Sequence, residues 1–143
     1  MNNHPILVVL LFAALTNPVA AQEHRFVMVA IAAGQTAQVN VANTGTNSTR
    51  EACHINIVFA DHDGNLISDP DSSNFVLRPG TVVSTAIDHP NLRPGERFHV
   101  RGQVRMLESK ATGRNECDGV RATFEVFDTD TGKTTIFWEL PTD

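Results

Sequence analysis

Residues 53–60 read CHINIVFA and carry the clearest structural pattern in the chain. Their apolar side chains recur at every second position, at Cys53, Ile55, Ile57 and Phe59. A period of two is typical of a β-strand that turns one face toward a hydrophobic core. The segment therefore predicts a strand whose Cys53 side chain points inward.

Turn signals follow this strand along the chain. Residues 61–65 read DHDGN, and an Asp-Gly pair between strand patterns favours a tight hairpin because Gly adopts positive φ readily. The tetrapeptide LRPG occurs at residues 77–80 and again at residues 92–95. Pro at the second position of a turn and Gly at the third suit type II, so we expect two similar turns there.

Further alternating or apolar segments fill most of the chain, and no helical periodicity is sustained. This pattern predicts an all-β protein, an antiparallel β-sandwich of about seven to nine strands, with a small β-barrel as the alternative. Trp138, in the last of these segments, is expected in the core. The further strands are expected near residues 25–31, 37–41, 66–67, 75–77, 82–87, 98–106, 120–126 and 134–140.

The N-terminal segment has the pattern of an export signal. Residues 6–15 are ten consecutive apolar residues, and residues 19–21 (VAA) supply small side chains for cleavage before Gln22. Such a helix spans about 15 Å, half of a hydrocarbon core about 30 Å thick, and is too short to cross a membrane. We expect residues 1–21 to be a signal peptide and residues 22–143 to form a single domain that is secreted or periplasmic, without a transmembrane segment. A buried N-terminal helix or strand is the alternative.

Cys53 and Cys117 are the only cysteines in the sequence. In an exported chain, an isolated pair predicts a disulfide because the compartment is oxidising. Closing a loop of roughly 60 residues stabilises a fold by about 4 kcal/mol in the chain-entropy treatment. Two unpaired thiols are the alternative, and a zinc site built on the pair has little support because no CxxC spacing occurs.

Three segments resemble small exported bacterial β-sandwich (immunoglobulin-like) proteins of uncharacterised function. They are residues 53–66 (CHINIVFADHDGNL), 76–84 (VLRPGTVVS) and 122–135 (ATFEVFDTDTGKTT). The resemblance implies an immunoglobulin-like sandwich and export. It implies no catalytic residues and no cofactor.

The DHDGN segment also offers oxygen ligands for a metal ion. Asp61, Asp63 and Asn65 match the first alternate positions of a calcium loop, but Leu66 stands where that loop requires Gly. His62 adds an imidazole, and these residues are the candidates for a metal-dependent site. A plain hairpin tip is the favoured interpretation, and neither a bound metal nor a cofactor is predicted.

Charge and the remaining polar residues point to surfaces. With 11 Lys and Arg against 16 Asp and Glu, the net charge of −5 argues against nucleic-acid binding. His54 and His99 share an outward parity and could meet across strands. Arg101 and Arg105 share a strand face with Gln103. Together with the arginines near the two LRPG turns, they form a basic strip that could contact an acidic partner: Arg78, Arg93 and Arg97.

The sequence contains no recognised catalytic motif, and strands and turns account for nearly every patterned residue. We therefore expect an exported, non-enzymatic protein that acts by binding or assembly, with an unknown protein or surface partner. One alternative is a pilus-like or surface assembly subunit that donates residues 26–31 as a strand. The other is a small metal-dependent hydrolase built around His54, His62, Asp61 and Asp63.

Overall fold

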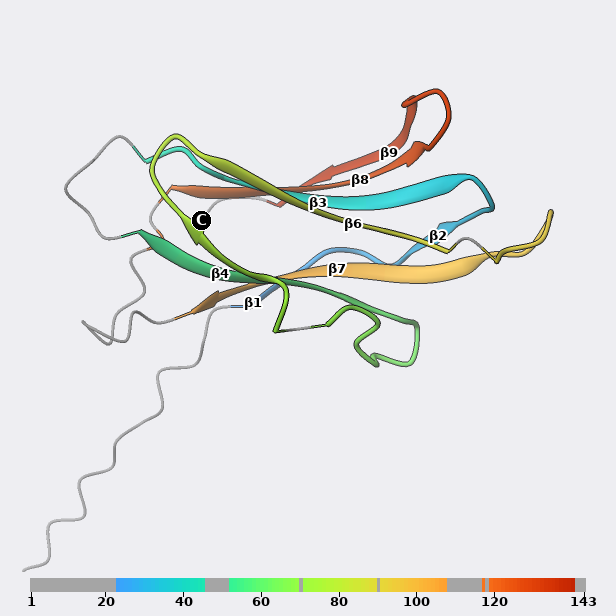
Figure 1. Ribbon diagram of the computed structural model, residues 1–143, viewed down its shortest axis with the longest axis horizontal. Helices are drawn as coiled ribbons and strands as arrows, with labels where there is room; N and C mark the ends of the chain where they lie inside the picture. Colours follow the sequence, from blue (N-terminus) through green and yellow to red (C-terminus); the bar gives the residue numbers. More distant parts are fainter. Residues whose placement is uncertain are drawn as a thin grey trace, which may run out of the picture.

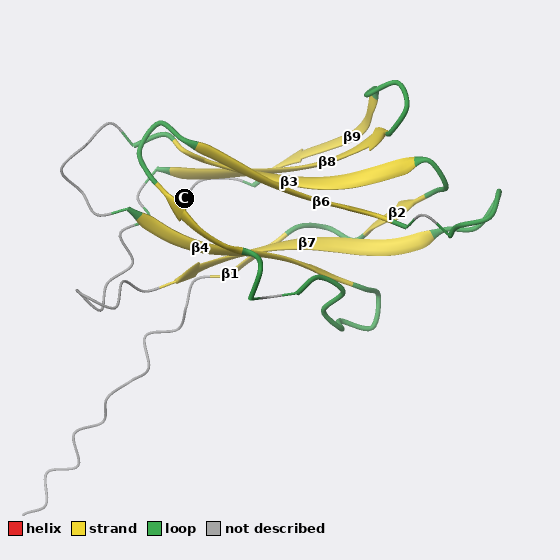
Figure 2. Cartoon of the chain, in the orientation of Figure 1, coloured by secondary structure: helices red, strands yellow, loops and turns green. Residues whose placement is uncertain are grey.

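The secondary structure of the described residues is entirely β, with nine strands and no helix (Figure 2). The computed structural model describes residues 23–45, 52–69, 71–89, 91–107, 117 and 119–140, so the predicted signal peptide lies outside it. No helix in these ranges is long and apolar enough to cross a membrane. The strands are β1 (Glu23–Arg25), β2 (Val29–Ile31), β3 (Gln35–Asn43), β4 (Cys53–Ala60), β5 (Asn74–Leu77), β6 (Val82–Asp88), β7 (Phe98–Leu107), β8 (Val120–Asp128) and β9 (Thr134–Glu139).

The strands form two antiparallel sheets that lie face to face (Figure 1). The first sheet has the order β1-β7-β4-β5, with β2 also paired to β7, and the second sheet has the order β6-β3-β8-β9. Strands β3 and β8 are the central strands of the second sheet, with β6 and β9 at its borders, and β4 and β7 pair in the first sheet. The predicted antiparallel β-sandwich is confirmed, and the described strands do not close into a barrel.

The core lies between the sheets and is filled by the inward-facing residues of the long strands. Successive side chains of a strand point to opposite faces, so burial recurs at every second position, as at Ala37, Val39 and Val41 on β3. Phe59 on β4 and Phe124 on β8 are the largest side chains with no exposure, and each sheet contributes one of them. The inward direction predicted for Cys53 is confirmed by its exposure of 0%.

The N-terminal edge differs from the continuous strand that the sequence predicts. Arg25 lies opposite Gln103 and Val29 lies opposite Val100, so four steps along this edge face three steps along β7. The extra residue makes a β-bulge across residues 26–28 and divides the edge into β1 and β2. An apolar pattern on both faces gives no sign of such a bulge, because only the register of the partner strand reveals it.

Phe26 turns inward at the bulge and closes the core against the second sheet. It is 3% exposed, and its ring centroid lies 5.4 Å from that of Phe124. Its backbone N–H donates a hydrogen bond to the carbonyl of Gly102 at 3.0 Å. A Cβ atom at Gly102 would lie 2.5 Å from Cγ2 of Val39, so this close approach of backbone and side chains requires glycine.

The two LRPG tetrapeptides form the similar turns that the sequence predicts. Thr81 N–H donates to the carbonyl of Arg78 at 3.1 Å, and Gly80 has a φ of 77°. In the second copy, Glu96 N–H donates to the carbonyl of Arg93 at 3.0 Å, and the glycine has a φ of 89°. Positive φ at the third position is the signature of a type II turn.

Candidate functional site

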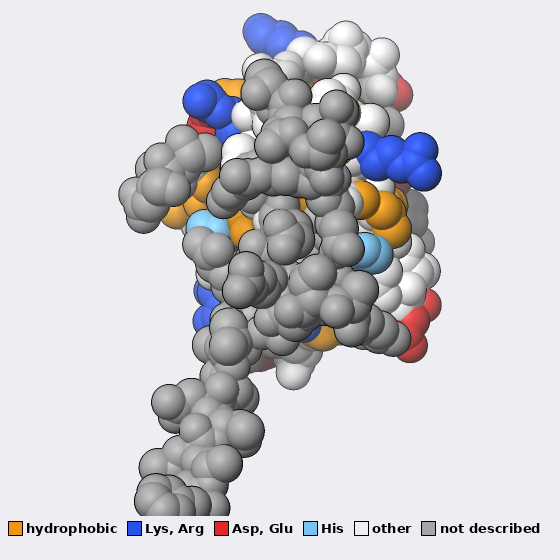
Figure 3. Space-filling model, turned by 90° about the vertical axis from the view of Figure 1, so that its left-hand side faces the viewer, with side chains coloured by type: hydrophobic (Ala, Val, Ile, Leu, Met, Phe, Trp, Pro, Cys, Tyr) orange, Lys and Arg blue, Asp and Glu red, His pale blue; other side chains and the backbone are white. Residues whose placement is uncertain are grey.

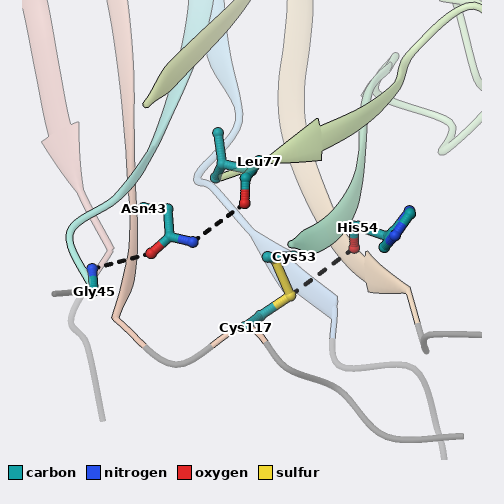
Figure 4. Close-up of a disulfide and its surroundings, with 6 residues drawn as sticks. All are labelled: Asn43, Gly45, Cys53, His54, Leu77 and Cys117. Carbon is teal, nitrogen blue, oxygen red and sulfur yellow. Dashed lines mark hydrogen bonds between the residues drawn. A yellow bond between two sulfur atoms is a disulfide. The ribbon is translucent and has the colours of Figure 1, made fainter. Parts of the chain in front are cut away.

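Cys53 and Cys117 form the predicted disulfide at one end of the sandwich (Figure 4). Their Cα atoms lie 4.8 Å apart, and both residues are buried. Cys53 begins β4 in the first sheet and Cys117 precedes β8 in the second, so the bond links the two layers covalently. A disulfide of this kind is typical of proteins that work in a non-cytoplasmic environment.

A buried amide closes the same end of the molecule. Asn43 is 4% exposed and donates from Nδ2 to the carbonyl of Leu77 at 3.2 Å, while its Oδ1 accepts from Gly45 N–H at 3.0 Å (Figure 4). Because Leu77 belongs to β5 of the first sheet and Asn43 to β3 of the second, this side chain also ties the layers together. Figure 3 faces this end and shows charged side chains of both signs around its rim, with hydrophobic ones between them.

The candidate metal residues of the DHDGN segment form a hairpin tip in which Asp61 holds the turn. Its Oδ1 accepts from the backbone N–H groups of Asp63 at 3.0 Å and Asn65 at 2.8 Å, and its Oδ2 accepts from Asn65 Nδ2 at 3.1 Å. The hydrogen bond from the Asn65 side chain is the main cause that lowers the pKa of Asp61 below its ordinary value. His62 Nε2 lies 3.3 Å from Asp63 Oδ2, and both side chains are exposed. In the ranges that the structure describes, no three His, Cys, Asp or Glu residues are grouped so that they could hold a metal ion.

The structure brings His62, rather than His54, next to His99. The β4–β7 ladder pairs Ala60 with Arg101 and carries His54 to the far end of the pair. The same register, continued past Ala60, places His62 opposite His99, and their ring centroids lie 6.3 Å apart. The expectation that His54 meets His99 is therefore wrong, because register decides which outward residues become neighbours.

Arg101 lies on the same outer face of the first sheet as His99, two residues farther along β7. Its Nε atom is buried, and no group accepts a hydrogen bond from it within the described part of the chain. The basic strip expected from the sequence is interrupted between Arg101 and Arg105, because Gln103 between them is only 3% exposed. Gln103 Oε1 accepts a hydrogen bond from Arg105 Nη2 at 3.4 Å. Among the arginines of the described strands, Arg101 differs in having no hydrogen-bond or ion-pair partner within the described ranges.

One other buried polar side-chain atom lacks a hydrogen-bond partner among the described residues, namely Nδ1 of His89. The His89 ring contacts Phe98, with the centroids 4.7 Å apart. It borders an open hollow of about 260 Å³, which Asp88 and Asp130 also line. The hollow lies where β6 ends beside two turns, and Gln35 and Thr129 also line it.

The outer strand of the second sheet exposes two large aromatic side chains. β9 pairs with β8 on one side only and forms a border of the sheet (Figure 1). Phe137 is 59% exposed and Trp138 is 48% exposed. The expectation that Trp138 belongs to the core is wrong. It lies opposite Phe124, on the core-facing side, but at an edge beyond which the described chain has no further strand to cover it.

No family model, no curated protein and no solved structure matches this chain. The resemblance to small exported sandwich proteins therefore stays an expectation from the three quoted segments. Function has to be argued from the geometry of the described residues.

Proposed function

We propose that this chain is an exported, non-enzymatic protein that acts by binding or assembly, and that β9 is its contact edge for a protein partner. The observation that carries the proposal is the edge of β9 with which no described strand pairs, together with its exposed Phe137 and Trp138. The disulfide and the signal-like residues 1–21 support export to a secreted or periplasmic location. No specific observation favours a metal-dependent hydrolase.

Backbone geometry makes β9 suitable for accepting an added strand. Leu140 N–H donates to the carbonyl of Ala122 on β8 at 3.0 Å. Because backbone groups alternate in direction along a strand, the N–H groups of Phe137 and Glu139 point away from β8 and toward the open edge. An extended segment of a partner could pair with these groups, while the aromatic side chains supply apolar contact area.

If the protein is an assembly subunit, the contacts of its N-terminal edge favour β9 over residues 26–31 as the strand that meets a neighbour. The sequence suggests residues 26–31 as a strand donated to a neighbour, but Phe26 and Ile31 are buried and β2 pairs with its own β7. β1 begins at Glu23, directly after the residue at which the predicted mature chain starts. An assembly subunit of this kind would accept a strand at β9 rather than donate its N-terminus.

Export is tested by fractionating cells that express the full chain and sequencing the N-terminus of the exported material. The expected result is a protein outside the cytoplasm that begins at Gln22 and contains no free thiol. A cytoplasmic chain that keeps residues 1–21 would contradict the export part of the proposal.

The edge is tested with extended peptides selected for binding from a random library. A bound peptide is expected to slow amide exchange at Phe137 and Glu139, and Phe137→Lys should weaken binding about ten-fold or more, as for a central apolar contact. Val82→Lys is the matched control, because Val82 is 62% exposed on β6, the other border of the same sheet. Peptides that protect β6 instead, or that lose equal affinity in both variants, would overturn the assignment of β9.

A further inference from the structure

We propose that Arg101, together with His99 and His62, forms a binding site for an oxyanion, the phosphate or carboxylate group of a small ligand, on the outer face of the first sheet. The site lies beside the DHDGN hairpin and is separate from the β9 edge, which belongs to the second sheet. It uses none of the residues through which the proposed partner contact would form.

The guanidinium of Arg101 has no counter-charge among the described residues. A guanidinium carries five N–H donors and keeps its charge in proteins, so a partly buried one is expected to have an acceptor. The Nε atom of Arg101 is buried and has none in the described ranges. Leaving such a donor unsatisfied is unfavourable, and an oxyanion is the partner that fits the planar fork best.

The other arginines of the described strands show what a satisfied guanidinium looks like in this molecule. Arg25 and Arg105 share the carboxylate of Glu23, with Nε–Oε1 distances of 3.1 Å and 3.6 Å. The hydrogen bond from Arg25 is the main cause that lowers the pKa of Glu23. Arg121 on β8 lies 3.6 Å from Glu139. Arg101, in contrast, has no carboxylate partner among the described residues, although the chain as a whole carries more acidic than basic residues.

Two imidazoles lie next to Arg101 along the same face of the sheet. The register that pairs Ala60 with Arg101 places His62 and His99 next along the same face, with their rings 6.3 Å apart. Imidazole N–H groups donate hydrogen bonds to oxyanions, so the three side chains present donors of one kind toward one face. Asp61 accepts hydrogen bonds within its own turn, whereas Asp63 Oδ2 lies 3.3 Å from His62 Nε2, so a bound oxyanion would replace this exposed carboxylate beside His62.

The surroundings of Arg101 on the outer face are partly shielded from water. Ala60 is 0% exposed and Gln103 is 3% exposed, although both flank Arg101 on the outer face. Fewer water molecules around a charge lower the effective dielectric and strengthen its attraction for a counter-ion. The β-bulge at residues 26–28 lies on the edge strand beside Arg101. It leaves the apolar Val27 and Met28 exposed there, so the bulge does not cover the site with a charged side chain.

The test is an NMR titration of the ¹⁵N-labelled protein with inorganic phosphate and, in a second arm, with acetate. Sodium chloride at matched ionic strength serves as the baseline for screening. We expect a saturable shift of the Arg101 Nε–H resonance and of the His99 and His62 ring signals. The anion with the lower dissociation constant identifies phosphate or carboxylate as the preferred group.

Variants separate a binding role from a structural one. Arg101→Met keeps the aliphatic stem and should weaken the anion response of the histidines about ten-fold or more, while Arg101→Lys, which keeps the charge without the fork, should fall in between. Arg121→Met is the matched control and should leave the response unchanged. No saturable shift up to roughly 50 mM of either anion, or an equal response in Arg101→Met, would overturn the site.

Discussion

The two ends of the sandwich differ in whether their buried polar groups have hydrogen-bond partners. At the disulfide end, Asn43 has a partner for both its amide donor and its carbonyl acceptor, and Cys53 is bonded to Cys117. At the hairpin end, the buried Nε of Arg101 has no acceptor among the described residues, and the nearby His62 lies beside His99 and the exposed Asp63. A satisfied group contributes to folding, whereas an unsatisfied one costs stability that binding can recover. Substitutions at the disulfide end should therefore mainly lower the free energy of unfolding, whereas Arg101→Met at the hairpin end should mainly weaken anion binding.

The largest loss of stability is expected from the disulfide end. Replacing Cys53 and Cys117 together by serine should lower the free energy of unfolding by about 4 kcal/mol, because the open loop gains conformational entropy in the unfolded chain. Denaturant unfolding monitored through Trp138 fluorescence measures the change. Reduction of the wild-type protein should produce a similar loss. A change below about 1 kcal/mol would show that the bond does not hold the layers together.

Asn43→Ala should give the next largest effect. The substitution leaves the carbonyl of Leu77 and the N–H of Gly45 without this buried partner, which costs about 2 kcal/mol. Chemical denaturation with the disulfide intact isolates the contribution. Asn40→Ala, on the half-buried outer face of the same strand, is the control and should cost less. Equal losses of unfolding free energy in the two variants would contradict a special stabilising role of the Asn43 amide at the disulfide end.

At the hairpin end, Asp61→Ala should have a smaller effect that depends on pH. The folded pKa of Asp61 is lowered, so the carboxylate stabilises the fold above its unfolded pKa, and this contribution is lost as the pH falls through the folded pKa. The wild-type protein and the variant should therefore differ at neutral pH and converge below the ordinary Asp value of 3.8. Unfolding midpoints measured between neutral and acidic pH give the answer, and a difference that persists in acid would contradict it.

The smallest effect on stability is expected from Arg101→Met. Removing an unpaired guanidinium while keeping its apolar stem should change the free energy of unfolding by no more than about 0.5 kcal/mol, and can raise it. Thermal and denaturant unfolding in anion-free buffer measure this. A loss comparable to that of Asn43→Ala would place Arg101 with the structural residues of the closed end.

Local patterns were enough to predict the parts of this molecule that depend on neighbours in sequence. The alternation of Cys53, Ile55, Ile57 and Phe59 identified β4, and Pro-Gly pairs identified both LRPG turns. The isolated cysteine pair identified the disulfide. In each case the determining interaction is either within a few residues or is the only pairing possible.

The candidate sites could not be predicted in the same way, because they depend on register and on which strand ends a sheet. Nothing in the sequence around His99 indicates that His62 will lie opposite it, and a shift of one residue would place another side chain there. The exposure of Trp138 follows from the place of β9 at a border, and its own strand pattern is that of a buried segment. The bulge at residues 26–28 likewise appears only when β1 and β2 are compared with β7.

The pairing of the N-terminal edge with β7 has a consequence for the order of folding. Glu23 pairs with Arg105, so a contact formed by the first strand spans roughly 80 residues and belongs to the slow class of non-local contacts. During synthesis at about 5–20 residues per second, the partner strand emerges at least roughly 4 seconds after β1. Phe26 therefore stays uncovered until β7 and β8 are available, and the first strand of the chain is among the last to reach its native position.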